Sequence, residues 1–170
     1  MTRAGARGGS AERGARFDIR TLGAGDVATM RSMLELFGEV FADASEHAAN
    51  RPDDPYLAQL LARDTFIAIA ATLDGAVVGG AASYVLPKYE QARSEIYLYD
   101  LAVAHAHRRK GIATALIDAL RAIAAARDAW VVFVQADHGD DPAIALYSKL
   151  GAREDVLHFD IAPAAGRGKR

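Results

Sequence analysis

The stretch SEIYLYDLAVAHAHRRKGIATALI, residues 94–117, contains the pattern that decides the fold. Residues 94–103 are predicted to form a strand, and the segment 111–127 has apolar residues at helical spacing. Between them, a triplet of cations at positions 108–110 is followed at once by Gly111. Positive charge at the start of a helix opposes the helix dipole, so the sequence predicts that an anion binds at this turn.

The basic turn (residues 104–111) has the features of a phosphate site. The first N–H groups of a helix have no partner within the helix, so they can point together at a phosphate. Gly111 lets a ligand approach the backbone closely. Arg108, Arg109 and Lys110 supply the opposite charge, and arginine binds phosphate through two parallel hydrogen bonds. The turn therefore predicts a pyrophosphate ligand; the alternative is a solvated basic turn that pairs with nearby acidic side chains.

Strands and helices alternate around this turn. We expect strands at 17–22, 65–73, 76–87, 94–103, 130–136 and 152–162, and helices at 26–41, 55–63, 111–127 and 141–151. The strand at 130–136 is a continuous apolar run as far as Val134, as expected when both faces are covered. This order predicts an α/β (α+β) fold with a mixed central sheet and helices on both faces. Open sheets of this kind bind ligands beyond the carboxyl ends of their strands, where the basic turn lies.

Length and charge indicate one globular domain with basic ends. The chain has 170 residues, 51% of them hydrophobic, and we expect a single domain over residues 16–162. Residues 1–15 and 163–170 are predicted to be basic tails. The whole chain has a net charge of −2, of which residues 1–15 contribute +2 and residues 163–170 contribute +3. The remaining residues, 16–162, therefore carry −7. An acidic body with one basic turn indicates two sites of opposite sign, or an acidic surface that only favours solubility. It lacks the broad basic face that nucleic-acid binding requires.

Several other classes of protein are disfavoured. No apolar run is long enough for a membrane span, and the N-terminus has no secretory signal. The chain has no cysteine, which fits a reducing, cytoplasmic location and leaves no thiolate for a metal site. His105 and His107 have no second ligand cluster, so we expect no metal. The stretch GAGDVA (23–28) fits a dinucleotide fingerprint, but the next strand begins near residue 65, too far away for a compact βαβ unit.

Two motifs resemble one family. The hexapeptide RRKGIA (108–113) has the form [Q/R]-x-x-G-x-[G/A] and resembles the acyl-coenzyme A loop of the GNAT superfamily of N-acetyltransferases. ALYSKLGA (145–152) looks like the superfamily's late helix, which carries a tyrosine. The expected order of elements also matches the superfamily. The resemblance implies a GNAT acyltransferase fold with acetyl-CoA as cosubstrate and no metal.

Longer stretches are similar to one branch of this superfamily, the GNAT-type aminoglycoside 3-N-acetyltransferases. The similar stretches are YVLPKYEQARSEIYLYDLAV (84–103), VQADHGDDPAIALY (134–147) and HFDI (158–161). This resemblance implies acetylation of the 3-amino group of 2-deoxystreptamine aminoglycosides such as gentamicin, hence antibiotic resistance, and a homodimer. A cysteinyl acyl-enzyme is impossible in this chain, which agrees with direct attack in a ternary complex.

The resemblance also assigns roles to residues. The strand before the basic turn would bind the pantetheine arm through its backbone, and the turn would hold the pyrophosphate. The donor-binding positions are Leu101, Ala102, Val103, Arg108, Arg109, Lys110, Gly111, Ile112, Ala113 and Thr114. Tyr147 matches the usual general acid; the alternative is a core tyrosine whose hydroxyl finds a partner.

Acidic residues are the candidates for binding and deprotonating the amine. Asp100 lies in an apolar strand, where a carboxylate is costly unless it is paired or near a cleft. We predict that it is the base or orients the amine; the alternative is a structural, hydrogen-bonded aspartate. The expected binding residues for a polycationic acceptor are Glu95, Asp137, Asp140 and Asp141, with Glu46, Asp53 and Asp54 as a further wall. Alternatively, Asp140 or Asp141 caps the following helix.

Two other functions remain open. A GNAT enzyme of this kind can act on another amine, such as a protein lysine, a protein N-terminus or a polyamine. A non-catalytic acyl-CoA-binding module would use the same loop but would need neither Tyr147 nor an acidic acceptor groove.

Overall fold

The structure, a computed structural model, describes residues 17–41 and 51–164. Residues 1–15, Glu46 and most of 163–170, for which the sequence made predictions, lie outside this part of the chain. The chain divides into two compact units, Met1–Gln135 and Ala136–Arg170. The single domain over residues 16–162 stays a prediction.

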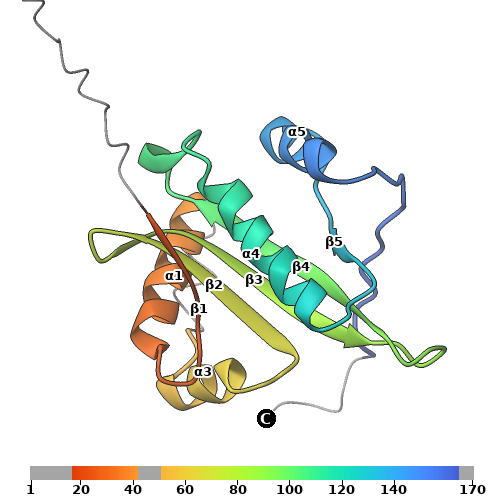
Figure 1. Ribbon diagram of the computed structural model, residues 1–170, viewed down its shortest axis with the longest axis horizontal. Coiled ribbons are helices and arrows are strands. Elements are labelled where there is room, and N and C mark those ends of the chain that lie inside the picture. The colour runs from red at the N-terminus through yellow and green to blue at the C-terminus, as the bar shows by residue number, and fades with distance from the viewer. Residues whose placement is uncertain (1–16, 42–50, 165–170) are drawn as a thin grey trace, which may run out of the picture. The chain divides into compact units, whose positions relative to one another are not determined.

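The first unit contains a five-stranded mixed sheet with strand order β1-β2-β3-β4-β5 (Figure 1). The first four strands pair antiparallel, and β5 pairs parallel to β4. The elements of this unit are β1 (Asp18–Thr21), α1 (Val27–Val40), α3 (Asp54–Leu61), β2 (Phe66–Leu73), β3 (Ala76–Pro87), β4 (Ser94–Val103), a 3₁₀ turn (His105–His107), α4 (Ile112–Ala126) and β5 (Val132–Val134). The predicted mixed sheet is confirmed.

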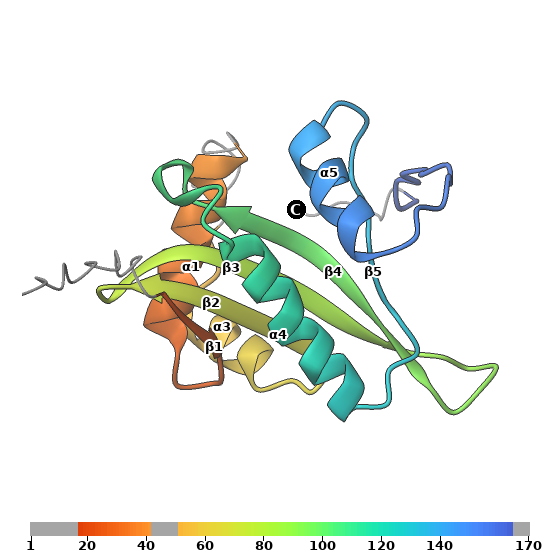
Figure 2. The same ribbon diagram turned by 45° about the horizontal axis from the view of Figure 1, so that its top comes forward.

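Helices cover both faces of this sheet, with α1 and α3 on one face and α4 on the other (Figures 1 and 2). Two adjacent glycines of β3 show how closely the helices approach. A Cβ at Gly79 would lie 2.9 Å from Cγ2 of Ile112 in α4. A Cβ at Gly80 would clash with Met33 in α1. Successive strand residues point to opposite faces, so the helices pack on β3 from the two sides.

The core beneath α1 and α3 combines large helix side chains with small strand side chains. Its buried members are Leu22, Met30, Met33, Phe37, Leu57, Leu61, Phe66, Ala68, Ala70, Ala82 and Ala102. Alanine leaves room above the strands for the helices to settle close to the sheet. On the opposite face, α4 buries Ile112, Leu116, Ile117, Leu120 and Ala124. These helices therefore hold the end of β4 and the start of α4 in fixed positions.

A bulge interrupts β4 just before its last residues. Ser83 of β3 pairs with Leu98, whereas the preceding residue, Ala82, pairs with Asp100. Tyr99 is therefore the extra residue of a β-bulge. The pairing of β4 with β5 covers only Ile96–Leu98, so residues 99–103 extend beyond β5.

Two sequence predictions for the C-terminal part were wrong. The strand expected at 130–136 is only three residues long, and Trp130 is 70% exposed, so the strand is not covered on both faces over its predicted length. The second unit contains one helix, α5 (Asp141–Leu150), and no strand forms over 152–162 within the described residues. The apolar side chains of Leu157 and Phe159 are 83% and 74% exposed. Alternation of apolar residues is a local property, whereas a strand also needs a neighbour to pair with.

Candidate active site

The basic turn is anchored to the end of the sheet by backbone hydrogen bonds. The N–H of Ala104 donates to the carbonyl oxygen of Val78 at 2.9 Å. The N–H of His107 donates to the carbonyl oxygen of Ala104 at 2.8 Å and closes the 3₁₀ turn. The chain then enters α4 at Ile112. The turn is therefore a defined loop at the carboxyl end of β4.

Gly111 gives α4 an open N-terminus. Its φ of 81° lies in the left-handed region, which favours glycine, and no atom lies within 4 Å of the position that a Cβ would take. No side chain among residues 17–41 and 51–164 caps this end of the helix. The first N–H groups of α4 thus have no capping side chain among the described residues and are available to a phosphate ligand.

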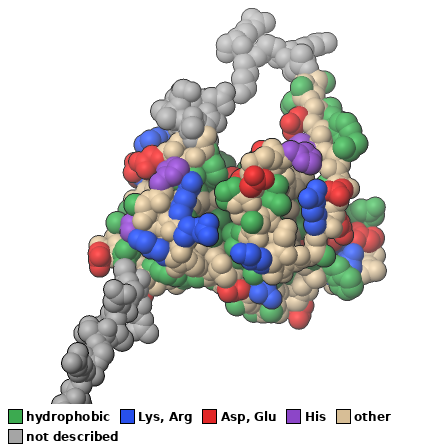
Figure 3. Space-filling view, turned by 90° about the horizontal axis from the view of Figure 1, so that it is seen from above, with side chains coloured by type: hydrophobic (Ala, Val, Ile, Leu, Met, Phe, Trp, Pro, Cys, Tyr) green, Lys and Arg blue, Asp and Glu red, His purple; other side chains and the backbone are tan. Residues whose placement is uncertain are grey.

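The three cations of the turn are placed differently. Nε of Arg108 donates to the carbonyl oxygen of Val103 at 3.3 Å, so this side chain lies back along the end of β4. Arg109 and Lys110 are exposed, and Arg109 has a φ of 63°. Viewed from above, Lys and Arg side chains gather on part of the surface close to histidines (Figure 3). The positive charge near the turn suits an anionic ligand.

The end of β4 offers a backbone edge. Leu101, Ala102 and Val103 pair with β3 on one side, opposite Ala81, Gly80 and Gly79 respectively. The parallel pairing on the other side ends at Leu98. A strand edge of this kind provides N–H and C=O groups for an extended ligand that carries amides.

Asp100 lies on the α1 side of the sheet, immediately before this edge. Asp100, in β4, pairs with Ala82 of β3, which is a member of the core beneath α1 and α3. The pKa values of Tyr84 and Tyr97 are both raised, mainly by burial of the hydroxyl groups. Neighbouring groups, Asp100 among them, raise both pKa values further through their charge. The Asp100 carboxylate is thus within electrostatic reach of both hydroxyls.

Glu95 lies five residues before Asp100 and takes part in a different set of contacts. Its carboxylate oxygens are 3.5 Å from Nζ of Lys88 and 4.0 Å from Nη2 of Arg93. These ion pairs tie the base of the β3–β4 hairpin together. The structure therefore gives Glu95 a local structural role, and its predicted acceptor binding stays untested.

In the second unit, Asp140 caps α5. Its Oδ1 accepts a hydrogen bond from the N–H of Ala143 at 3.1 Å, and its own N–H donates to the carbonyl oxygen of Asp137 at 3.2 Å. The capping role left open by the sequence is confirmed for Asp140. Asp141 occupies the first turn of the same helix, where an acidic residue complements the helix dipole.

Tyr147 lies two turns along α5 from Asp140 and is half-buried. Burial raises the pKa of the Tyr147 hydroxyl above its usual value, and the negative charge of Asp140 raises it further. The hydroxyl therefore stays protonated at neutral pH and is available as a hydrogen-bond and proton donor.

Asp53 and Asp54, which the sequence predicted as part of a further wall of the acceptor site, have structural partners. Asp53 caps α3, since its Oδ1 accepts a hydrogen bond from the N–H of Tyr56 at 2.9 Å. Oδ1 of Asp54 accepts one from Nε of Arg31 at 2.6 Å. These contacts explain both residues without an acceptor groove.

The glycine-rich stretch at 23–28 is not a dinucleotide site. The N–H of Gly23 already binds an internal anion, because it donates a hydrogen bond to Oδ2 of Asp26 at 2.8 Å. Asp26 also pairs with Arg20 at 2.6 Å, and these two partners, Gly23 first, lower the pKa of its carboxyl group. The preceding strand β1 pairs antiparallel, not as part of a βαβ unit. Asp26 immediately precedes α1, but its side chain makes no capping hydrogen bond to that helix.

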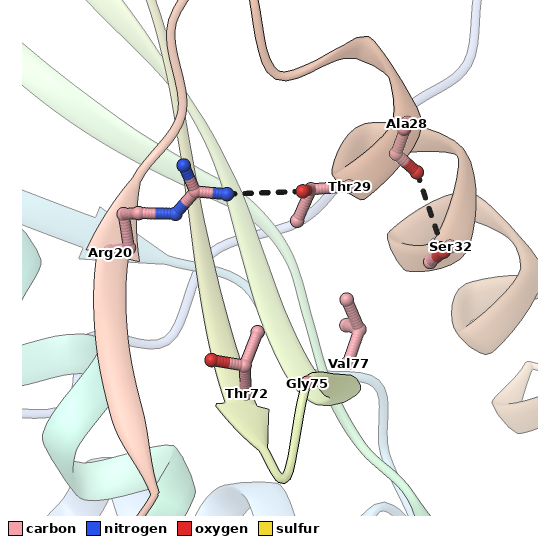
Figure 4. Close-up of a pocket in the computed structure, with 7 residues that line it drawn as sticks. All are labelled: Arg20, Ala28, Thr29, Ser32, Thr72, Gly75 and Val77. Carbon is pink, nitrogen blue, oxygen red and sulfur yellow. Dashed lines mark hydrogen bonds between the residues drawn. The ribbon is translucent and has the colours of Figure 1, made fainter.

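An open hollow of about 370 Å³ lies elsewhere in the first unit (Figure 4). Its lining residues are Arg20, Ala28, Thr29, Ser32, Thr72, Gly75 and Val77. Nη2 of Arg20 donates to Oγ1 of Thr29 at 3.1 Å, and the same guanidinium pairs with Asp26. The cation of this hollow is thus already neutralised, and none of the predicted site residues lines it.

Metal-ligand clusters and membrane-spanning helices are both absent from the part of the chain that the structure describes. No group of three or more His, Asp or Glu side chains in this part of the chain is arranged to hold a metal ion. No helix within it has the length and apolar character needed to cross a membrane.

Tyrosine rings surround Asp100, and they were not predicted from the sequence. Tyr97 and Tyr99 stand on either side of Leu98 in β4. Tyr84 of the neighbouring strand β3 pairs with Tyr97. The alternation YLY before an acid is visible in the sequence, but which face of the sheet it occupies depends on the bulge.

Comparisons with known proteins agree on a family. A profile of the acetyltransferase (GNAT) family matches residues 30–152. An aminoglycoside acetyltransferase from an uncultured soil metagenomic sample has 56% sequence identity to the chain, a TM-score of 0.85, and coverage of 88% of this chain and 99% of the other.

Two further relatives are more distant. A second aminoglycoside acetyltransferase from an uncultured soil sample, with structures in complex with trehalose or sisomicin, has 33% identity, a TM-score of 0.81, and coverage of 87% and 97% of the two chains. An N-alpha-acetyltransferase of Sulfurisphaera tokodaii is 34% identical over an alignment of 95 positions, and the match covers 49% of this chain. The match covers 54% of that relative, so the chain spans about half its length.

Proposed function

The chain belongs to the GNAT family of acetyltransferases, and on that premise we propose that it acetylates the 3-amino group of a 2-deoxystreptamine aminoglycoside such as gentamicin. The observation that carries the substrate class is the 56% identity to an aminoglycoside acetyltransferase over nearly the whole of both chains. The net charge of −7 on the body suits a polycationic acceptor. The choice of the 3-amino position rests on the sequence resemblance.

The residues of the first unit fit the donor that this family uses, acetyl-CoA. The open N-terminus of α4 at Gly111 would hold the pyrophosphate through the N–H groups of Ile112, Ala113 and Thr114. The basic triplet would supply the counter-charge. The backbone of residues 101–103 would pair with the pantetheine arm along the edge that β5 leaves open.

Acetyl-CoA supplies the acetyl group as an activated thioester. In the proposed reaction Asp100 takes a proton from the acceptor ammonium or orients the amine, which frees the nitrogen lone pair. The nitrogen then bonds to the acyl carbon while the carbon–sulfur bond breaks, and the nitrogen releases its second proton to water. Tyr147 donates its proton to the departing sulfur, a role that its raised pKa suits because the hydroxyl is protonated at neutral pH.

A second candidate function is acetylation of a protein N-terminus. The observation that favours it is the 34% identity to an N-alpha-acetyltransferase, although this covers only 49% of the chain. A non-catalytic acyl-CoA-binding module would show donor binding without turnover. A change of Tyr147 to Phe would then leave its donor affinity unaltered.

A thiol-release assay with acetyl-CoA tests these alternatives. The acceptors are gentamicin, a deoxystreptamine derivative without a free 3-amino group, and a peptide with a free N-terminus. We expect turnover with gentamicin alone, and NMR of the product should place the acetyl group on the 3-amino nitrogen. Turnover with the blocked derivative would reject the 3-amino position, and turnover with the peptide alone would reject the aminoglycoside class.

Three parts of the proposal concern the cell and the assembly. Resistance is tested by expression in a susceptible strain, with a raised inhibitory concentration of gentamicin as the expected result. The homodimer is tested by sedimentation. The cytoplasmic location is tested by fractionation of the source cells.

A further inference from the structure

A row of aromatic rings crosses four strands of the sheet. Phe66 pairs with Tyr84, Tyr84 with Tyr97, and Tyr97 with Phe133. The ring centroids of Phe66 and Tyr84 are 5.3 Å apart, and Tyr97 stacks on Phe133 at 4.9 Å with an interplanar angle of 5°. Side chains at paired positions lie on the same face, so the row is a product of the strand register.

The bulge in β4 adds Tyr99 to this row. Its ring centroid lies 5.6 Å from that of Tyr84 and 5.5 Å from that of Tyr97, in edge-to-face geometry. The bulge also places the next residue, Asp100, opposite Ala82 on the same face. A carboxylate therefore stands at the end of a surface of rings, one residue before the strand edge proposed for the donor.

The rings are accessible, and their orientation is fixed. Tyr99 is 58% exposed and Tyr84 37% exposed, whereas Phe66 is buried in the core beneath α1 and α3. The hydroxyl of Tyr97 donates to Oε1 of Gln135 at 2.6 Å. The row thus runs from that core out to solvent, and a ligand would meet rings that need little ordering.

We propose that Tyr84, Tyr97 and Tyr99, the aromatic platform, bind the acceptor as an aminosugar, with a ring of the sugar against the tyrosines and an ammonium group directed to Asp100. This inference rests on the proposed function and deepens it. An aromatic face attracts both apolar C–H surface and cations, and an aminosugar presents both. The platform and Asp100 join directly to residues 101–103, so an amine held there lies close to the donor edge.

Calorimetry of gentamicin binding, together with steady-state kinetics, tests the platform through Tyr99→Leu. Leucine keeps an apolar side chain but removes the aromatic face. We expect the Kd and the KM for gentamicin to rise about 3- to 30-fold, the range of one cation–π contact from exposed to desolvated sites, while the KM for acetyl-CoA stays within about twofold. Tyr99→Phe keeps the ring and should restore most of the affinity.

Tyr89→Leu is the matched control. Tyr89 lies in the β3–β4 connection, is fully exposed and is not part of the platform. Equal effects of Tyr89→Leu and Tyr99→Leu, or no effect of Tyr99→Leu on gentamicin binding, would overturn the inference, as would failure of the wild-type chain to bind any aminosugar.

The two proposals fail separately. Wild-type turnover of gentamicin with an unaffected Tyr99→Leu variant would overturn the platform alone. Gentamicin binding that Tyr99→Leu weakens, without turnover by the wild-type chain, would support the platform and reject the proposed reaction.

Discussion

Replacing Gly79 by alanine should weaken donor binding, because Gly79 lies between the donor strand and the first turn of α4. The new Cβ would stand 2.9 Å from Cγ2 of Ile112 and 3.3 Å from the carbonyl oxygen of Ala102. Carbon atoms pack at about 3.5 Å or more, so Ile112 must retreat by about 0.6 Å. The carbonyl belongs to a paired strand and has less freedom to yield, so the displacement falls on the start of α4.

This displacement has two expected costs. Overpacking of a well-filled interior destabilises a protein by about 1–3 kcal/mol, which for a chain of this length lowers Tm by roughly 2–12 °C. Misplacement of a binding group by about 1 Å costs up to ~100-fold in rate. A shift of about 0.6 Å in the phosphate-binding N–H groups should therefore raise the KM for acetyl-CoA severalfold, about 3- to 30-fold.

The matched variant is Gly80→Ala, which makes the same chemical change on the opposite face of β3. Its Cβ would displace Met33 of α1. The core cluster that contains Met33 includes no residue of the basic turn and none of α4 among the described residues. We expect a similar loss of Tm but an unchanged KM for acetyl-CoA. Thermal melts and donor titrations measure the two quantities. The proposed link between Gly79 and the donor site is wrong if Gly79→Ala lowers the Tm without raising the KM for acetyl-CoA. It is also wrong if the two variants raise this KM equally.

Three further predictions concern the basic turn and α5. Gly111→Ala should cost about 1–2 kcal/mol of stability, because alanine is strained at a φ of 81°; denaturant unfolding should show a smaller loss for Gly111→Asn. Tyr147→Phe should lower kcat about 100-fold with little change in the gentamicin KM; an unchanged kcat would exclude its role as the acid. Asp140→Asn keeps a capping side chain but removes a charge, so ultraviolet titration should show a lower pKa for Tyr147. Because the pKa of Tyr147 is raised above the ordinary tyrosine value, the rate of the wild-type enzyme should fall through loss of the Tyr147 proton only above about pH 10. A fall in rate near pH 7 would have to come from the titration of another group.

Much of the fold could be predicted because its signals are local. Asp74 and Gly75, the two residues between the strands expected at 65–73 and 76–87, form a pair typical of a tight hairpin turn, and both have positive φ, as that turn requires. The spacing of apolar residues located α4, and Gly111 located its left-handed start. The capping alternative for Asp140 was also read from position alone.

The parts that failed depend on pairing or on partners distant in sequence. The length of β5 follows from how many residues find hydrogen bonds on β4, which no single stretch of sequence records. The partners of the Asp26 carboxylate, the N–H of Gly23 and the guanidinium of Arg20, likewise depend on how the chain folds and not on the position of Asp26 before α1. The aromatic platform was not predicted because it depends on the bulge at Tyr99. The register between β4 and β3 fixes this bulge and, with it, the face of the sheet that each ring occupies.

The same bulge sets how β4 can change in length. Ile96 and Leu98 are buried on one face, and Asp100 points to the other. A chain that lacked Tyr99 would continue directly from Leu98 to Asp100 in regular alternation, so both faces would keep their residues. Loss of Ile96 instead would turn the preceding side chains over. Among homologues, one-residue deletions in this strand should therefore concentrate at the bulge, where a shorter strand retains its core and its acid but gives up one ring.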